Sequence, residues 1–417
     1  LVAMEGHAEE VNGVEFLHDG RVLSWSNDGT LRLWQGETGR ELAVMQGHRG
    51  RVNGALVLPE GNVLSWSNDC TLRLWHGTTG AALALMEGHR ASVLGARVLP
   101  DGHRVVSWSH DGTLRLWTAQ TGSPLAVMVG HTDDTVDAEV LTDGRVLSWA
   151  GDGTLRLWDS RDGAPLAVMI GHASSVQGAK VLADDRILSW SRDGTLRLWD
   201  SYAASLALTN SYRGPVENAK LLPDGRVLSW SRDGAMCFWN GQTGEALVLM
   251  EGHTNPVDNP LVLADDRVLS WAHWSWLLTS PSGDCSLRLW DGRTGASLAV
   301  MEGHTSGIEG AVVLADNRVL SWSWDCTLRL WDGQTGSLLA VMEEHAGPVS
   351  GATVLADGRI LSWACDGIGP DPNHSAYTLR VWDGQTGAAL AVMARCFEIP
   401  ELEDAALLPD ASILGRS

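Results

Sequence analysis

The sequence predicts an all-β protein: a single closed β-propeller of four-stranded antiparallel blades, with about nine full blades and a degenerate partial tenth. Two observations lead to this prediction. The segment RVLSWSNDGTLRLW, which ends at Trp34, returns with small changes along the chain, and each repeat holds four short apolar runs. The copies are spaced by 40 to 42 residues, except for two steps of 51, and their closing tryptophans are Trp34, Trp75, Trp117, Trp158, Trp199, Trp239, Trp290, Trp331 and Trp382.

Each repeat carries four candidate strands, in the order LAVMEGH, VxGAxVLxDG, RVLSWSxDG and TLRLWDGxTG. Every run is rich in β-branched and apolar residues and ends in a turn containing Gly or Asp, which is typical of strands. The runs are too short for helices. Four of them in succession predict a four-stranded meander. One such sheet cannot bury both faces, whereas sheets stacked around an axis cover each other.

The ends of the chain depart from the complete repeat. We expect one domain over residues 1–417, with nine repeats over 8–393. Residues 1–7 match an outer strand, and residues 394–417 match a faded repeat in which AALLPDASILGRS aligns with GAxVLPDGRVLSWS. We expect these two ends to share the closure of the ring; nine and ten blades both stay open. Because the chain starts at Leu1 rather than Met, we expect it to be part of a longer polypeptide.

Two dipeptides link the repeat to a known family. Gly-His occurs at Gly6-His7 and again at His48, His89, His131, His172, His253 and His304; Trp-Asp occurs at Trp158-Asp159 and again at Asp200, Asp291, Asp332 and Asp383. This pattern resembles the WD-repeat (β-transducin-like) family over nearly the whole chain.

The resemblance implies a buried hydrogen-bonded tetrad in each blade, formed by the Gly-His histidine, a second-strand serine, a turn aspartate and the third-strand tryptophan. A buried imidazole requires partners for both ring nitrogens. The expected members are His7, Ser26, Asp28 and Trp34 in the first blade, and His304, Ser323, Asp325 and Trp331 in the eighth. The sixth blade has Tyr212 in the histidine position and the ninth has Glu344-His345, so we expect both to be locally weaker.

Composition restricts the partners. The formal net charge is −21, which disfavours nucleic acid and anionic membranes, since both require a basic surface. The six cysteines, Cys70, Cys237, Cys285, Cys326, Cys365 and Cys396, have neither CxxC nor disulfide-scaffold spacing. We therefore expect reduced thiols and a cytoplasmic protein, with no apolar run long enough to span a membrane.

We expect no catalytic, metal or cofactor site. The recurring His, Ser and Asp could suggest a catalytic triad, but a triad needs one activated nucleophile in one pocket, and this set recurs at one spacing in most repeats. His103 with His110, and Asp371 with His374, supply too few ligands for a metal. No phosphate-binding GxxxxGK[ST] loop and no GxGxxG loop occurs.

Comparison of the repeats with one another marks two variable positions. One precedes the aspartate of the turn between the second and third strands (the Asp turn), and includes Asn27, Asn68, His110, Arg192, Arg232 and Trp324. The other lies one residue past the first valine or isoleucine of the first strand and includes Glu309. The segment after Gly-His (the GH loop) also varies. In a propeller these segments share one end of the ring, so two interpretations stay open: partner specificity, or free drift of exposed turns.

Two blades carry insertions at this end, at His273 to Asp284 and at Asp366 to Thr378. The first contains Trp274, Trp276 and Leu277 outside the repeat pattern, and large apolar side chains on a protruding loop favour a contact role. Together with Trp324, they are the expected hot spot. The alternative is that the loop folds back over its own blade.

The sequence thus predicts a non-catalytic scaffold or sensor that binds a protein or peptide. By analogy with sensor propellers of signalling NTPases, the chain could follow an upstream signalling domain. The alternative is a small-ligand binder or enzyme that uses the central channel, where Glu15, Arg97, Glu139, Lys180 and Lys220 are candidates. Near-identical repeats leave the oligomeric state open.

Overall fold

The computed structural model describes residues 4–182, 184–200, 205–208, 212, 214–263, 265–272, 284–368, 375–397, 404–407 and 413–416. The chain divides into two compact units, residues 1–208 and residues 209–416, each of which is described by itself. Each four-stranded sheet is called a blade and is numbered in chain order.

The described part of the first unit contains five antiparallel four-stranded blades, each with its strands in chain order across the sheet. Blades 1 and 2 consist of β1 (Val11–Phe16), β2 (Arg21–Ser26), β3 (Thr30–Gln35), β4 (Glu41–Gln46), β5 (Val52–Val57), β6 (Val63–Ser67), β7 (Leu72–Trp75) and β8 (Ala82–Met86). Blades 3 to 5 consist of β9 (Val93–Val98), β10 (Arg104–Ser109), β11 (Thr113–Thr118), β12 (Pro124–Val129), β13 (Thr135–Val140), β14 (Val146–Ala150), β15 (Thr154–Trp158), β16 (Pro165–Ile170), β17 (Val176–Val181), β18 (Ile187–Ser191), β19 (Leu196–Trp199) and β20 (Ser205–Leu208).

The described part of the second unit contains four more such blades and a two-stranded hairpin. Blades 6 and 7 consist of β21 (Val216–Leu221), β22 (Arg226–Ser231), β23 (Met236–Asn240), β24 (Ala246–Met250), β25 (Val257–Val262), β26 (Arg267–Ala272), β27 (Leu287–Asp291) and β28 (Ser297–Met301). Blades 8 and 9 and the hairpin consist of β29 (Ile308–Val313), β30 (Arg318–Ser323), β31 (Leu328–Asp332), β32 (Leu338–Met342), β33 (Val349–Val354), β34 (Ile360–Ile368), β35 (Ser375–Trp382), β36 (Ala389–Phe397), β37 (Asp404–Leu407) and β38 (Ile413–Arg416).

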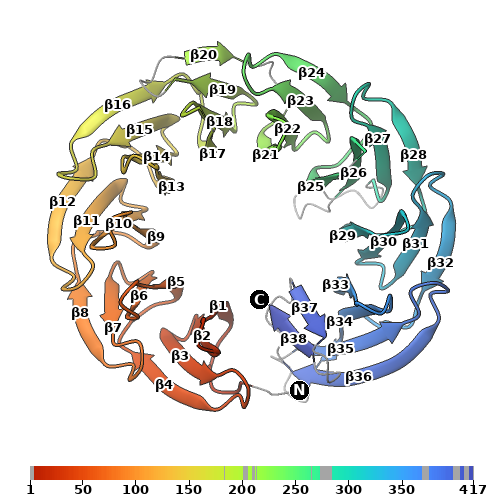
Figure 1. The fold of residues 1–417 in the computed structure, drawn as a ribbon, viewed down its shortest axis with the longest axis horizontal. Helices are drawn as coiled ribbons and strands as arrows, with labels where there is room; N and C mark the ends of the chain where they lie inside the picture. The colour runs from red at the N-terminus through yellow and green to blue at the C-terminus, as the bar shows by residue number, and fades with distance from the viewer. Residues whose placement is uncertain are drawn as a thin grey trace. The chain divides into compact units, whose positions relative to one another are not determined.

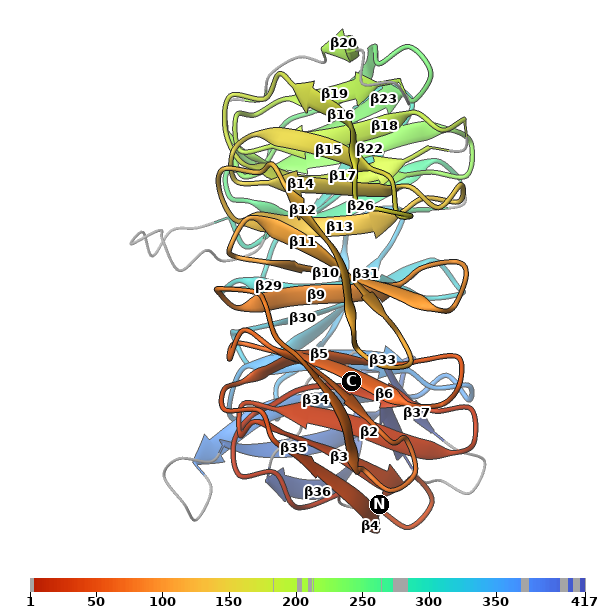
Figure 2. The same ribbon diagram turned by 90° about the vertical axis from the view of Figure 1, so that its left-hand side faces the viewer.

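The blades confirm the predicted meander. Within each unit the first strands lie on the inner side of an arc and the fourth strands on its outer side (Figure 1). Figure 2 shows the sheets of the first unit nearly edge-on, each stacked on the next. The ninth-blade insertion lengthens the sheet, because Cys365 pairs with Tyr377 and Ile368 with Ser375 beyond the usual length of these strands.

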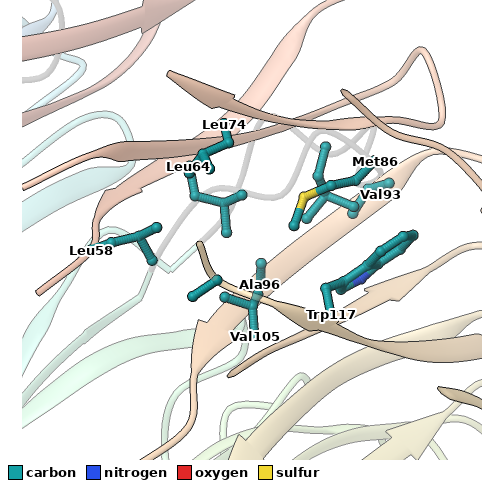
Figure 3. Close-up of a cluster of buried hydrophobic side chains, with 10 residues drawn as sticks. Leu58, Leu64, Leu74, Met86, Val93, Ala96, Val105 and Trp117 are labelled. Atoms are coloured by element: carbon teal, nitrogen blue, oxygen red, sulfur yellow. The ribbon is translucent and has the colours of Figure 1, made fainter. Parts of the chain in front are cut away.

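The cores lie between blades, as the predicted stacking of the sheets implies. Between blades 2 and 3, Leu64, Leu74 and Met86 from one sheet pack against Val105 and Trp117 from the next (Figure 3). Equivalent clusters join the other neighbouring blades within each unit. Each blade therefore depends on its neighbours for burial, as expected of a repeat array.

A glycine of the first strand makes room for the second-strand tryptophan. In blade 1, a Cβ added to Gly13 would lie 2.3 Å from Cζ2 of Trp25, a separation that atoms cannot adopt. The same close approach occurs at Gly54, Gly95, Gly178, Gly310 and Gly351. This explains why the repeat reads VxGA.

Candidate functional site

The polar residues that recur from repeat to repeat form one hydrogen-bonded cluster. In blade 1, His7 Nδ1 lies 3.0 Å from Asp28 Oδ2, and His7 Nε2 lies 2.8 Å from the hydroxyl of Ser24. The indole N–H of Trp34 donates to the same hydroxyl at 2.8 Å. One serine therefore joins the imidazole to the indole beneath the Asp turn.

The cluster repeats along the chain with nearly constant geometry. Each of its eight described histidines lies 2.8 Å from the bridging serine. The bridging serines are Ser24, Ser65, Ser107, Ser148, Ser189, Ser229, Ser270, Ser321 and Ser362, and each accepts the indole N–H of the blade's third-strand tryptophan.

The sequence prediction chose the wrong serine. Ser26 and Ser323 were expected in the cluster, but Ser24 and Ser321 hold these places. Residues two apart in a strand share a face, so the pattern SWS offers two serines to the same side. Ser26 lies nearer the Asp turn, where it accepts the backbone N–H of Asp28 and donates to the carbonyl of Glu9. Ser323 has the same position in blade 8.

A fifth member, absent from the prediction, is the threonine after the Asp turn. The hydroxyl of Thr30 donates to Asp28 Oδ1 at 2.7 Å, and its backbone N–H donates to the same oxygen at 2.8 Å. The recurring DGT and DCT of the repeats was the signal for it. Burial alone would raise the pKa of Asp28, but the N–H of Ala8, both groups of Thr30 and the His7 ring lower it to about 2.

Burial favours the neutral form of five cluster histidines. It lowers the pKa of His7, His89, His131, His172 and His304, although the neighbouring aspartate opposes the shift in each case. The neutral tautomer that fits carries its proton on Nδ1, which then donates to the aspartate. Nε2 accepts the serine O–H, and the serine oxygen accepts the indole N–H. Every polar group of the cluster is then paired.

This arrangement has the connectivity of a Ser-His-Asp triad but cannot act as one. A nucleophilic serine must reach a substrate and be able to give up its proton there. Ser24 is 5% exposed and Ser321 is 0% exposed, and each hydroxyl already bonds both an indole and an imidazole. The cluster therefore stabilises the blade rather than activating a nucleophile.

Blades 6 and 9, which lack the Gly-His dipeptide, form the cluster with different residues. In blade 6 the hydroxyl of Tyr212 lies 2.5 Å from Ser229 Oγ, so a phenol replaces the imidazole on the serine side. In blade 9, His345 keeps its serine, and Glu344, in place of glycine, accepts from Nη1 of Arg380 at 2.6 Å. The equivalent arginine lies against the glycine in other blades, as Arg32 does against Gly6. Whether these blades are weaker stays a prediction.

In blades 1 to 5 and 8 two hydrogen bonds join the GH loop to the Asp turn above the cluster. In blade 1 the N–H of Ala8 donates to Asp28 Oδ2 at 2.9 Å, and the N–H of Asn27 donates to the carbonyl of Glu10, also at 2.9 Å. In blade 8, Thr305 and Trp324 make the equivalent bonds at 2.9 and 3.0 Å. We call the GH loops and Asp turns together the loop face. In blades 1 to 5, 7 and 8 its backbone is held by the aspartate of the Asp turn.

In blades 1, 2, 6 and 8 the residues at the two variable positions are hydrogen-bonded to each other. Asn12 bonds Asn27 at 3.0 Å, and Asn53 bonds Asn68 at 2.9 Å. In the second unit Arg232 pairs with Glu217 at 2.5 Å, and the indole N–H of Trp324 donates to Glu309 at 2.5 Å. A pair therefore changes as a pair, from amide–amide to ion pair to indole–carboxylate.

Some of these side chains also reach the next blade. Asn12 donates to the carbonyl of Val52, and Asn53 to that of Val93, at 2.9 and 2.8 Å. His110 of blade 3 lies 2.9 Å from Asp134 in the next GH loop. Asn68, His110, Arg192 and Arg232 are exposed, whereas Asn27, Glu309 and Trp324 are half-buried. Trp274, Trp276 and Leu277 lie outside the described residues.

Known families can be compared with this geometry. The family described as "WD domain, G-beta repeat" (WD40) matches residues 1–35, 39–76, 80–118, 122–159, 163–200 and 295–332, more than half of the chain. The chain belongs to the WD40 repeat family. Three blades of this WD40 chain lie outside the matched residues. They are blade 6, which has Tyr212 in the histidine position, and blades 7 and 9, which contain the insertions.

A solved structure supports the same assignment. The computationally designed Ika8 protein is 28% identical to this WD40 chain, with a TM-score of 0.52, over 80% of this chain and 99% of its own. Among curated proteins, none matches the sequence.

Other candidate sites are modest. Among the described residues no three His, Cys, Asp or Glu side chains could hold a metal ion, and no helix is long and apolar enough to span a membrane. The five cysteines with described side chains form no disulfide. A shallow pocket of about 520 Å³ on the inner strands of the first unit is lined by Leu56, Trp66, Ala96, Arg97, Val98, Pro100, Glu139 and Val140.

Proposed function

We propose that this WD40 chain is a non-catalytic scaffold whose loop face binds a protein or peptide. One observation supports the proposal most directly. The backbone of the loop face is held by hydrogen bonds, whereas the side chains that it displays differ from blade to blade. Bonds from the buried aspartate and from the GH-loop carbonyl fix the loops before any partner arrives. Such preorganisation lowers the entropy cost of binding, and different side chains on one frame supply specificity.

The hot spot proposed for this face is in the second unit. Trp324 is a half-buried aromatic whose indole N–H is held by Glu309, so its ring has one orientation to offer. Rigid aromatics of this kind dominate binding energies. We propose that Trp274, Trp276 and Leu277 of the preceding blade's insertion contribute to the same contact.

A peptide-library selection against the full chain would test this. Selected peptides should bind the wild-type chain and lose at least ten-fold in affinity with Trp274→Ala plus Trp276→Ala, and with Trp324→Ala. His18→Ala and His103→Ala, exposed turn residues between first and second strands, serve as matched controls and should bind normally. Unchanged thermal midpoints would show that the variants fold. Peptides that bind the tryptophan variants as tightly as the wild type would place the site elsewhere.

We also propose how the ring closes and where the protein acts. A single closed ring of nine blades is supported by the unbroken repeat, with residues 1–7 and 394–417 sharing the closure. The hairpin of β37 and β38 suits the two strands that the faded repeat retains. A sensor role beside an upstream signalling NTPase is supported by the analogy of near-identical repeats. A cytoplasmic location is supported by the five cysteines with described side chains, which form no disulfide.

The alternative, a small-ligand site on the inner strands, has one supporting observation, the pocket beside Arg97 and Glu139. Its main charged donor is already engaged: Arg97 Nε donates to the carbonyl of Ala138 at 2.9 Å, and its guanidinium lies 6.0 Å from the ring centre of Trp108. The loop face therefore remains the better supported site.

A further inference from the structure

The outer strands of blades 3 and 4 depart from the repeat at their last residue. The residue directly after the buried methionine of the fourth strand is Gln46, Glu87, Glu251, Glu302 and Glu343 in other blades. In blades 3 and 4 it is Val129 and Ile170, which are 70% and 75% exposed. These are the two most exposed large hydrophobic side chains among the described residues, and they occur in neighbouring blades.

Each of these residues completes an apolar row. In β12, Leu125 and Val127 share a face with Val129, while Ala126 and Met128 point to the core on the other side. In β16, Leu166 and Val168 share a face with Ile170 in the same way. Figure 1 shows β12 and β16 following one another along the outer side of the first unit. The six side chains form what we call the rim patch.

The same two strands differ from the others at their start. Pro124 and Pro165 pair with the third-strand tryptophan, a place held by Glu41, Ala82, Ala246, Ser297 and Leu338 elsewhere. Proline has no N–H to offer to an added strand and is a common block on edge pairing. The rim patch is therefore suited to contact through side chains rather than by strand addition.

We propose that the rim patch is a self-association surface that pairs with the rim patch of a second copy of this chain. The six side chains of the rim patch are all apolar, so the patch can pack against a second copy of itself, as a two-fold interface requires. With Leu83 and Leu85 of β8 at its border, the patch offers eight apolar residues that are 37% to 75% exposed, and a standard interface buries ~800 Å² on each partner.

Charge selects this place over the rest of the outer surface. The chain carries a net charge of −21, so copies repel each other at long range, and the glutamates directly after four outer strands, Glu87, Glu251, Glu302 and Glu343, keep negative charge at the rim. Val129 and Ile170 remove that charge in two adjacent blades. Salt screens the repulsion but not the apolar contact, so association should strengthen with added salt.

Sedimentation equilibrium of the full chain tests the proposal. The wild type should show a monomer–dimer equilibrium in the micromolar range that tightens at least three-fold between 50 and 500 mM NaCl. Val129→Glu with Ile170→Glu should weaken it by ten-fold or more. Other blades carry glutamate at this position, so the variant should keep its thermal midpoint.

Leu247→Glu with Leu298→Glu is the matched control: both leucines are 48% exposed on outer strands, and the same charge is added. It should leave the dimer within two-fold of wild type. A photo-crosslinking residue at Val127, in a mixture of isotopically light and heavy chains, should link β12 to β12 or β16 of the other copy. A wild type that is monomeric at 100 µM, equal weakening by both variants, or crosslinks to another surface would overturn the proposal.

Discussion

At the scale of single residues, one serine hydroxyl per blade has the largest structural role. Ser321 accepts the indole N–H of Trp331 and lies 2.8 Å from His304 Nε2, while the other ring nitrogen reaches Asp325 at 2.9 Å. The aspartate then holds the GH loop. A buried side chain thus sets the backbone that the loop face displays.

Removing this hydroxyl should be costly. Ser321→Ala leaves the indole N–H of Trp331 and Nε2 of His304 without partners, and each buried unpaired group costs about 1–3 kcal/mol. We expect the local opening free energy of β29–β32, measured by native-state hydrogen exchange, to fall by about 2–4 kcal/mol. Ser306→Ala, on the half-buried GH loop, is the control. Equal effects of the two changes would contradict the role given to Ser321.

At the scale of a strand, the first-strand glycine decides how the second strand packs. Gly178→Ala would place a methyl 2.2 Å from Cζ2 of Trp190 in a filled interblade core. Overpacking of this kind costs about 1–3 kcal/mol, which denaturant unfolding of the variant should show. Gly50→Ala, whose nearest neighbour would be 3.3 Å away, should cost much less. A neutral Gly178→Ala would mean that the tryptophan can move aside.

Blade 4 offers the reverse experiment, because Asp137 stands where most blades have this glycine. Burial raises the pKa of Asp137, and the indole N–H of Trp149 and the hydroxyl of Thr135 are buried without a hydrogen-bond partner. A raised pKa means that the carboxylate costs stability as pH rises through that pKa. Asp137→Gly should therefore raise the thermal midpoint at pH 7 and raise it less at pH 4. A lower midpoint at pH 7 would show that the carboxylate has a favourable role.

At the scale of the whole molecule, the repeat made the blade predictable. Four short apolar runs in each repeat are compatible with few sheet arrangements other than a four-stranded meander. The resemblance to the WD-repeat family implied His7, Asp28 and Trp34 as members of a hydrogen-bonded cluster, and the structure places them there. The repeat could not separate Ser24 from Ser26, since both point to one side and only their distance from the turn distinguishes them. The pairing of Glu309 with Trp324 was also missed. The repeats were compared one position at a time, and such a comparison does not reveal two positions that change together.

The repeated cluster should make the whole protein sensitive to acid. Burial lowers the pKa of five cluster histidines, so the unfolded chain binds protons more readily as pH falls below the ordinary value of 6.5. Stability from these groups is then complete above 6.5 and is lost below it. The aspartates, such as Asp28 with its pKa of about 2, add a second loss below their ordinary value of 3.8. The thermal midpoint by calorimetry should be level from pH 8 to 7, fall by pH 5 and fall further below pH 4.

Acid also reduces the repulsion within a chain of charge −21, which acts in the opposite direction. Measurements in high salt suppress that repulsion, so a midpoint that stays level from pH 7 to 5 in high salt would show that the histidines do not govern the stability.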